Sequence, residues 1–132
     1  MNGPTRYAIG SKSMTLISHL CGAQLQAPDL GACLRLLLLA PVLEECVVRA
    51  GLQEWMMRQV ADGGMHVPQA APVLASTAVF GLLHLGAGWQ QALAVLAPGL
   101  ALALLYQGTR SWRWCALAHG GMNAFAISVC GL

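Results

Sequence analysis

LLLLAPVLEECVVR, residues 36–49, places two adjacent glutamates and an arginine inside a run of otherwise apolar residues. Only 9% of the chain is charged, so three ionisable residues in one apolar run form a marked concentration. A charged side chain at the centre of a membrane helix costs about 2.5 to 3.5 kcal/mol on insertion scales. The stretch therefore predicts a helix in apolar surroundings in which Glu44, Glu45 and Arg49 have a functional role.

The composition extends this prediction to the whole chain. Apolar residues make up 57% of its 132 residues, whereas soluble domains are about 45 to 50% apolar and about 25% charged. We therefore expect an all-α, polytopic transmembrane helical bundle that forms a single membrane-embedded domain over residues 1–132. The net charge of +2, without any run of Lys or Arg, argues against nucleic acid as a partner.

Breaks in the apolar pattern divide the bundle into four core helices. Asp29 is a plausible N-cap for the first helix, and Pro41 is a site at which that helix could kink. Residues 1–28 allow an additional short N-terminal helix, either spanning or interfacial, so the motif-bearing core covers about 30–132. The expected core helices are 30–60, 72–85, 89–107 and 111 to the end.

The basic residues between the helices predict an orientation. Arg58, Arg110 and Arg113 fall on the same side of such a bundle, which the positive-inside rule makes cytoplasmic. A chain this short favours the inner (plasma) membrane of a bacterium.

The helical period divides the acidic cluster into two parts. Glu45 and Arg49 lie at i and i+4, which places them on one face in the order that favours an ion pair. Glu44 is turned about 100° away from Glu45 and is left available. A purely structural ion network would explain the pair but not the additional carboxylate.

Two later helices carry polar clusters of their own. His84 follows Phe80 by one turn, and His119 and Asn123 share a face with Gly120 between them. Either cluster alone would suit a hydrogen-bonded core residue or polar contacts between packed helices. Together with Glu44, they predict one site if the three helix faces converge.

The order of these clusters resembles a known family. APVLEECVVRAGL, STAVFGLLHLG and ALAHGGMNAFA are similar to the three signature motifs of the CPBP family, the CAAX-protease and bacteriocin-processing (Abi) intramembrane endopeptidases. The likeness covers roughly residues 35 to 130. Family members usually have an aromatic residue before the Arg and a Gly after it, where this chain has Val48 and Ala50, a departure that bears on substrate docking.

The resemblance implies a role for each catalytic residue. Glu44 would be the general base that activates water, with help from His84, and His119 and Asn123 would stabilise the oxyanion of the tetrahedral intermediate. These roles suit the chemistry, because imidazole and carboxamide N–H groups donate hydrogen bonds to developing negative charge.

Three further residues would support that site. The resemblance makes Glu45 and Arg49 the orienting ion pair, in agreement with their spacing, and Phe80 a residue that lines the site.

The sequence allows two mechanisms, one that uses a zinc ion and one that is free of metal. Glu44, His84 and His119 could also supply a His₂Glu zinc set with one open position, as in zinc hydrolases. We favour a metal-free mechanism without a cofactor, since a metal-bound Glu44 would leave no evident second carboxylate to act as base.

The expected function is hydrolysis of a peptide bond near the membrane-embedded or lipidated end of a protein or peptide, by an intramembrane endopeptidase. The expected partners are that membrane-anchored substrate and the lipid bilayer. Two other classes would also place Glu and His in a membrane: a proton-coupled transporter, and a non-catalytic binding or immunity protein. The chain shows no inverted repeat of the kind typical of transporters.

Overall fold

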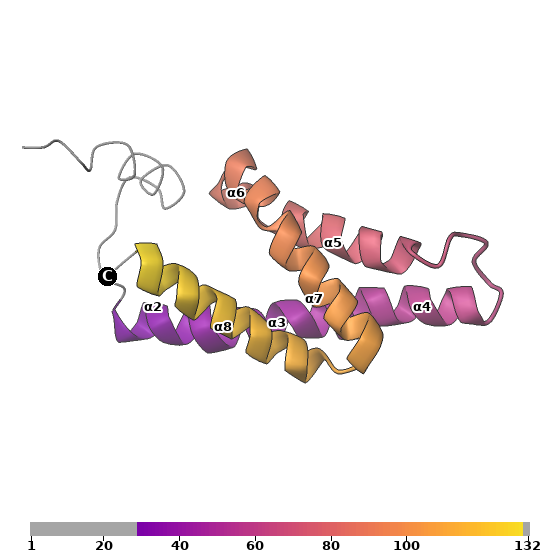
Figure 1. Cartoon of the computed structure of the whole chain (residues 1–132), viewed down its shortest axis with the longest axis horizontal. Helices are drawn as coiled ribbons and strands as arrows, with labels where there is room; N and C mark the ends of the chain where they lie inside the picture. The colour runs from indigo at the N-terminus through magenta and orange to yellow at the C-terminus, as the bar shows by residue number, and fades with distance from the viewer. Residues whose placement is uncertain (1–28, 131–132) are drawn as a thin grey trace, which may run out of the picture.

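The computed structural model describes residues 29–130, and these form helices and the turns that join them. The first helix is one continuous rod from Leu30 to Ala61 (Figure 1). Its α-helical parts are α2 (Leu30–Leu34), α3 (Ala40–Glu45) and α4 (Glu54–Ala61). Between them lie two π-helical segments with wider turns, Arg35–Leu39 and Cys46–Gln53. The all-helical prediction is therefore confirmed for the part of the chain described.

The ends of the first helix follow from local chemistry. The Asp29 side chain accepts a hydrogen bond from the Ala32 amide at 2.7 Å, which caps the N-terminus as expected. At the other end the chain turns at Asp62 and Gly63, where the glycine has a φ of 73° that suits a residue without a Cβ. Pro41 lies within the rod, directly after the first π-helical segment.

Three further helical stretches complete the described chain. The second is α5 (Ala71–Leu83), followed by a short 3₁₀ turn over Leu85–Ala87. Gly88, at a φ of 107°, separates this turn from the third stretch. The third and fourth stretches are α6 (Trp89–Ala94) with α7 (Leu96–Thr109), and α8 (Trp112–Cys130). Four core helices were predicted, and each begins and ends close to its expected residues; the additional N-terminal helix would fall within residues 1–28, outside the described part.

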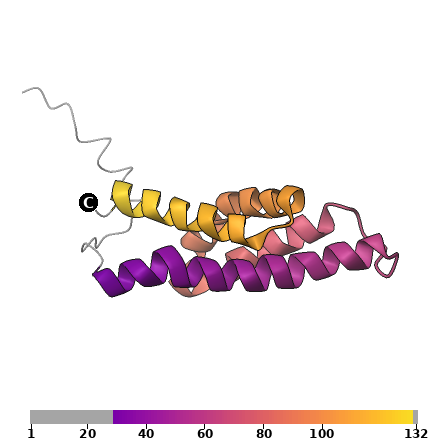
Figure 2. The same cartoon turned by 90° about the horizontal axis from the view of Figure 1, so that it is seen from below.

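The other helices pack along different parts of the first one. α8 lies along its N-terminal half, α5 packs on the segment Cys46–Gln53 and on α4, and α7 packs on both α5 and α8. Figure 2 shows the first helix along one side with α8 beside its N-terminal half. The middle of the first helix, around Glu45, is therefore where the other helices meet it.

The interior is small and unusually polar. Phe80, Leu102, Tyr106 and Cys115 form its apolar cluster. Within residues 29–130, six polar or charged residues are also buried: Glu45, Arg49, Gln53, Ser76, Thr77 and His119. Large apolar side chains cover the outside instead, as on helices that face lipid.

Among the described helices, one is long and apolar enough to cross a membrane, Trp89–Thr109, and most of it is not buried inside the protein. α5 with its 3₁₀ turn is apolar but shorter. The first helix contains Glu44, Glu45 and Arg49, and α8 contains His119 and Asn123. The charged and polar residues expected to form the site therefore lower the hydropathy of the two helices that carry them, the first helix and α8.

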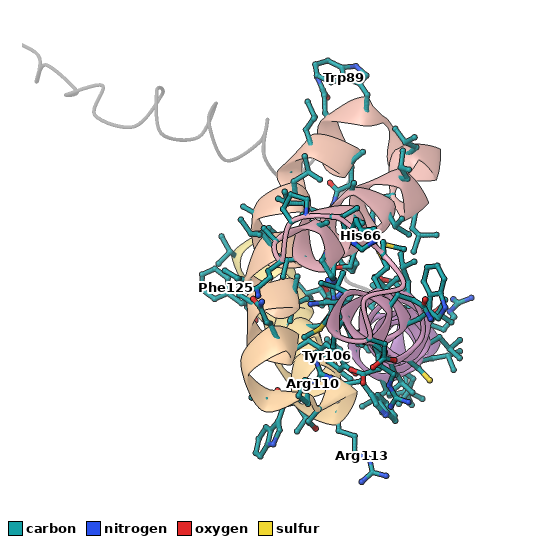
Figure 3. The ribbon with its side chains drawn as sticks, turned by 90° about the vertical axis from the view of Figure 1, so that its right-hand side faces the viewer. His66, Trp89, Tyr106, Arg110, Arg113 and Phe125 are labelled. Carbon is teal, nitrogen blue, oxygen red and sulfur yellow. The ribbon has the colours of Figure 1, made fainter. Side chains whose placement is uncertain are left out.

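The three arginines expected on one side of the bundle, Arg58, Arg110 and Arg113, lie toward one end of the protein (Figure 3). Glu54 pairs with Arg58 at 2.9 Å and with Arg110 at 3.2 Å, so α4 and the end of α7 lie together. Tyr106 donates a hydrogen bond to the same carboxylate at 3.0 Å. Figure 3 shows Arg110 and Arg113 at one end and Trp89 at the other.

Gly120 sets the distance between α8 and the first helix. A Cβ at Gly120 would lie 2.6 Å from the Leu37 carbonyl oxygen, whereas a Cβ at Gly121 would meet nothing within 4 Å. We expect Gly120→Ala to lower the free energy of unfolding by about 1 to 3 kcal/mol, because a backbone atom cannot move aside as a flexible side chain can. Thermal unfolding in detergent measures this, with Gly121→Ala as the matched control. Equal midpoints for the two variants would contradict the close approach.

Candidate active site

The centre of the site is an ion pair inside the first helix. Arg49 Nε donates to Glu45 Oε2 at 2.8 Å, and both side chains are completely buried. Glu45 ends α3, and Arg49 lies in the π-helical segment that follows. Such wide turns inside α-helices are frequent at functional sites.

The Arg49 guanidinium connects this pair to two other helices. Its Nη2 donates to the Gly99 carbonyl of α7 at 3.1 Å, and its carbon lies 5.4 Å from the centre of the Phe80 ring of α5. The cation over the ring face is favourable, most of all where water is excluded. A single buried arginine thus joins the first helix to α5 and α7.

Gln53 continues this face and was not among the predicted residues. Its amide donates to the Ala103 carbonyl at 2.8 Å, and its oxygen accepts from the Ser76 hydroxyl at 3.0 Å. Gln53 follows Arg49 by four residues, as Arg49 follows Glu45, so the sequence does contain the signal: a polar residue at every fourth position of an apolar helix.

His119 of α8 lies between the two glutamates. Its Nδ1 is 3.1 Å from Glu45 Oε1, and its Nε2 is 4.0 Å from Glu44 Oε2. An ionised carboxylate only accepts hydrogen bonds, so Nδ1 carries the hydrogen in the bond to Glu45. That bond fixes the ring and directs Nε2 toward Glu44.

Glu44 is the member of the cluster without a hydrogen-bond partner. Its Oε2 is buried, and among the described residues nothing lies within hydrogen-bonding distance of it. The separation of 4.0 Å from His119 is too long for a direct hydrogen bond but suits a bridging water. A buried carboxylate oxygen left without a partner is costly, which makes it a candidate for chemistry.

Phe80 places the second histidine beside this cluster. Its ring centre is 4.9 Å from that of His84 and 5.3 Å from that of His119, and only 2% of the residue is exposed. His84 Nδ1 bonds to the Phe80 carbonyl at 2.9 Å. A carbonyl oxygen only accepts, so Nδ1 carries the hydrogen and Nε2 of the neutral ring has a free lone pair.

Asn123 makes a different contact from the one its predicted role requires. Its side-chain nitrogen donates to the Leu36 carbonyl of the first helix at 2.8 Å. The structure therefore joins Glu44, Glu45, Arg49, Phe80 and His119 in one cluster, and His84 lies beside it in contact with Phe80. Asn123 bonds instead to the helix backbone further toward the N-terminus.

Comparison with known proteins decides the family. The family model for Rce1-like type II CAAX prenyl endopeptidases matches residues 26–125, which is most of the chain. The chain belongs to this family. The comparison with curated proteins and that with solved structures found no match to it.

Membership of the Rce1-like family carries two conclusions. It is a family of membrane-embedded endopeptidases, so it implies a protease whose substrates are proteins or peptides. The match also covers all three polar clusters, because it runs from before Glu44 to beyond Asn123.

The zinc alternative can be tested against the geometry. Within residues 29–130, no three His, Cys, Asp or Glu side chains are grouped so that they could hold a metal ion. In this arrangement Glu44, His84 and His119 are not grouped as a His₂Glu set.

Proposed function

We propose that this Rce1-like chain is an intramembrane endopeptidase in which Glu44 activates the attacking water. One observation carries the proposal: a buried Glu44 oxygen without a partner, 4.0 Å from His119 Nε2, in a chain whose family consists of proteases. A water between these two atoms would hydrogen-bond to both and lie next to a base.

The proposed reaction uses Glu44 first as a base and then as an acid, and gives each histidine one hydrogen-bonding role. Glu44 takes a proton from the water as its oxygen attacks the substrate carbonyl carbon, and His84 Nε2 accepts a hydrogen bond from the same water. His119 Nε2 donates to the oxyanion that forms, which requires the ring to carry hydrogens on both nitrogens. Glu44 then gives its proton to the leaving amine as the C–N bond breaks.

Supporting residues hold these groups in place. The Glu45 carboxylate, fixed by Arg49, binds His119 Nδ1, and the Phe80 ring packs against both histidines. The resemblance also predicts a second oxyanion donor, Asn123. One of its two amide N–H groups is bound to the Leu36 carbonyl, so only the other is left for that role.

We further propose that the four helices cross the membrane of a bacterium, with Arg58, Arg110 and Arg113 at the cytoplasmic face. The glutamate would then act inside the bilayer, on the membrane-anchored end of a protein or peptide.

The test is cleavage by the purified chain in liposomes made in H₂¹⁸O. Three peptides share one sequence: one with a prenylated C-terminal tail, one without the prenyl group, and one extended into a transmembrane anchor. Mass spectrometry should find one ¹⁸O in the new carboxyl terminus of a cleaved peptide, and 1,10-phenanthroline should leave the rate unchanged. A rate abolished by the chelator and restored by zinc would refute the metal-free mechanism. An intact fold that cleaves none of the peptides would favour a binding or transport protein.

A further inference from the structure

Pro41 leaves a gap in the hydrogen bonding of the first helix. In the π-helical segment before it, the Ala40 amide bonds to the Arg35 carbonyl, five residues earlier. The next amide in that register would belong to residue 41 and bond to the Leu36 carbonyl. Proline has no N–H, so Leu36 loses this donor.

Asn123 of α8 supplies the missing donor. Its side-chain amide reaches the Leu36 carbonyl at 2.8 Å, and Gly120, one turn earlier on α8, lies against the next carbonyl, that of Leu37. The contact therefore replaces a bond within the first helix by a bond between two helices. Such a replacement fixes α8 along the axis of the first helix, because only one position of Asn123 meets this carbonyl.

The same face of α8 carries His119, one turn before Asn123. His119 must lie level with two glutamates at once, since its Nδ1 bonds to Glu45 at 3.1 Å and its Nε2 faces Glu44 at 4.0 Å. A small slide of α8 would lengthen both distances, and shifts of about 1 Å in catalytic geometry cost rate out of proportion to their size.

We propose that Asn123 is a positioning residue that holds His119 in register by occupying the Leu36 carbonyl that Pro41 leaves free. This proposal rests on the proposed function for its effect on rate, but not for the bond itself. It assigns to Asn123 a task different from that of an oxyanion donor, and it makes Pro41 and Asn123 a coupled pair although they lie on different helices.

The test restores the missing N–H. Asn123→Ala should lower kcat by about tenfold, the rate equivalent of one hydrogen bond, with little change in KM. Adding Pro41→Ala gives residue 41 an amide that can bond to Leu36, so the double variant should recover most of the lost thermal midpoint. It should not recover kcat, because the bond that holds α8 on the first helix is still absent. Pro98→Ala, a proline replacement in α7, is the matched control and should not restore the midpoint.

Each result has a distinct meaning. If Pro41→Ala restores kcat together with the midpoint, the register of α8 does not depend on Asn123 and the positioning role is wrong. As a single change, Pro41→Ala should lower kcat, because the new amide competes with Asn123 for the Leu36 carbonyl; an unchanged kcat would mean that Asn123 acts on the reacting atoms instead. If the double variant does not recover the midpoint, the coupling between Pro41 and Asn123 does not exist. A wild-type chain that cleaves no peptide would refute the proposed function. The thermal midpoints of Asn123→Ala and of the double variant would still decide whether Asn123 replaces the hydrogen bond that Pro41 removes.

Discussion

Glu44→Gln is expected to lower the rate of peptide cleavage by about 10² to 10⁴-fold, the usual contribution of a general base. The amide has nearly the same shape as the carboxylate but cannot take a proton from water. The fold should remain intact, since the buried Oε2 of Glu44 has no hydrogen bond among the described residues that the substitution would break. Cleavage in liposomes and thermal unfolding in detergent measure the two effects separately.

Glu54→Gln is the matched control for this variant. Glu54 lies on the same helix, but its carboxylate pairs with Arg58 and Arg110 at the charged end of the protein. We expect the control to cleave at nearly the wild-type rate. Cleavage by Glu44→Gln at the wild-type rate would show that another group activates the water. Loss of the folded structure in this variant would show that Glu44 has a structural role.

Arg49→Met is expected to cause the largest loss of stability, about 3 to 5 kcal/mol, because it leaves the Glu45 charge buried without its partner. It also removes the hydrogen bond to Gly99 and the contact with the Phe80 ring. The double variant Glu45→Gln, Arg49→Met should lose less than the sum of the two single variants, as expected for residues in direct contact. Thermal unfolding of all four proteins measures the coupling.

The chain contains its own control for this experiment. Glu54 and Arg58 have the same spacing and a similar distance, 2.9 Å against 2.8 Å for Glu45 and Arg49. The Arg58 side chain is 70% exposed, whereas that of Arg49 is fully buried. Arg58→Met should therefore lower the stability far less than Arg49→Met, because exposed ion pairs are weakened by solvent. Similar losses for the two arginines would show that the inner pair is not shielded from solvent.

Local signals were sufficient to predict the helices. Asp29 at the start of the first helix, the Asp-Gly turn at its end and Gly88 between the second and third act on a few neighbouring residues, so their effects could be predicted without a tertiary structure. The two π-helical segments could not, because the wide turns have no comparable signature in the residues that form them.

The site was predictable where it depends on spacing along one helix. Glu45 and Arg49 form the pair that four residues of separation allow. Contacts with backbone carbonyls were not predictable, since every residue has one and only the packed structure selects Leu36, Gly99 and Ala103. For the same reason the bond from the Asn123 amide to the first helix could not be predicted.

α7 supports the site through its main chain. The carbonyls of Gly99 and Ala103 hold Arg49 and Gln53, and a Cβ at Gly99 would lie only 2.8 Å from the Phe80 ring. Main-chain oxygens are the same for every amino acid, so the exposed residues of α7 can change freely as long as Gly99 and Ala103 stay small and Leu102 and Tyr106 keep their places in the core. A protein engineer could likewise exchange its lipid-facing side chains to suit another membrane and leave the catalytic machinery untouched.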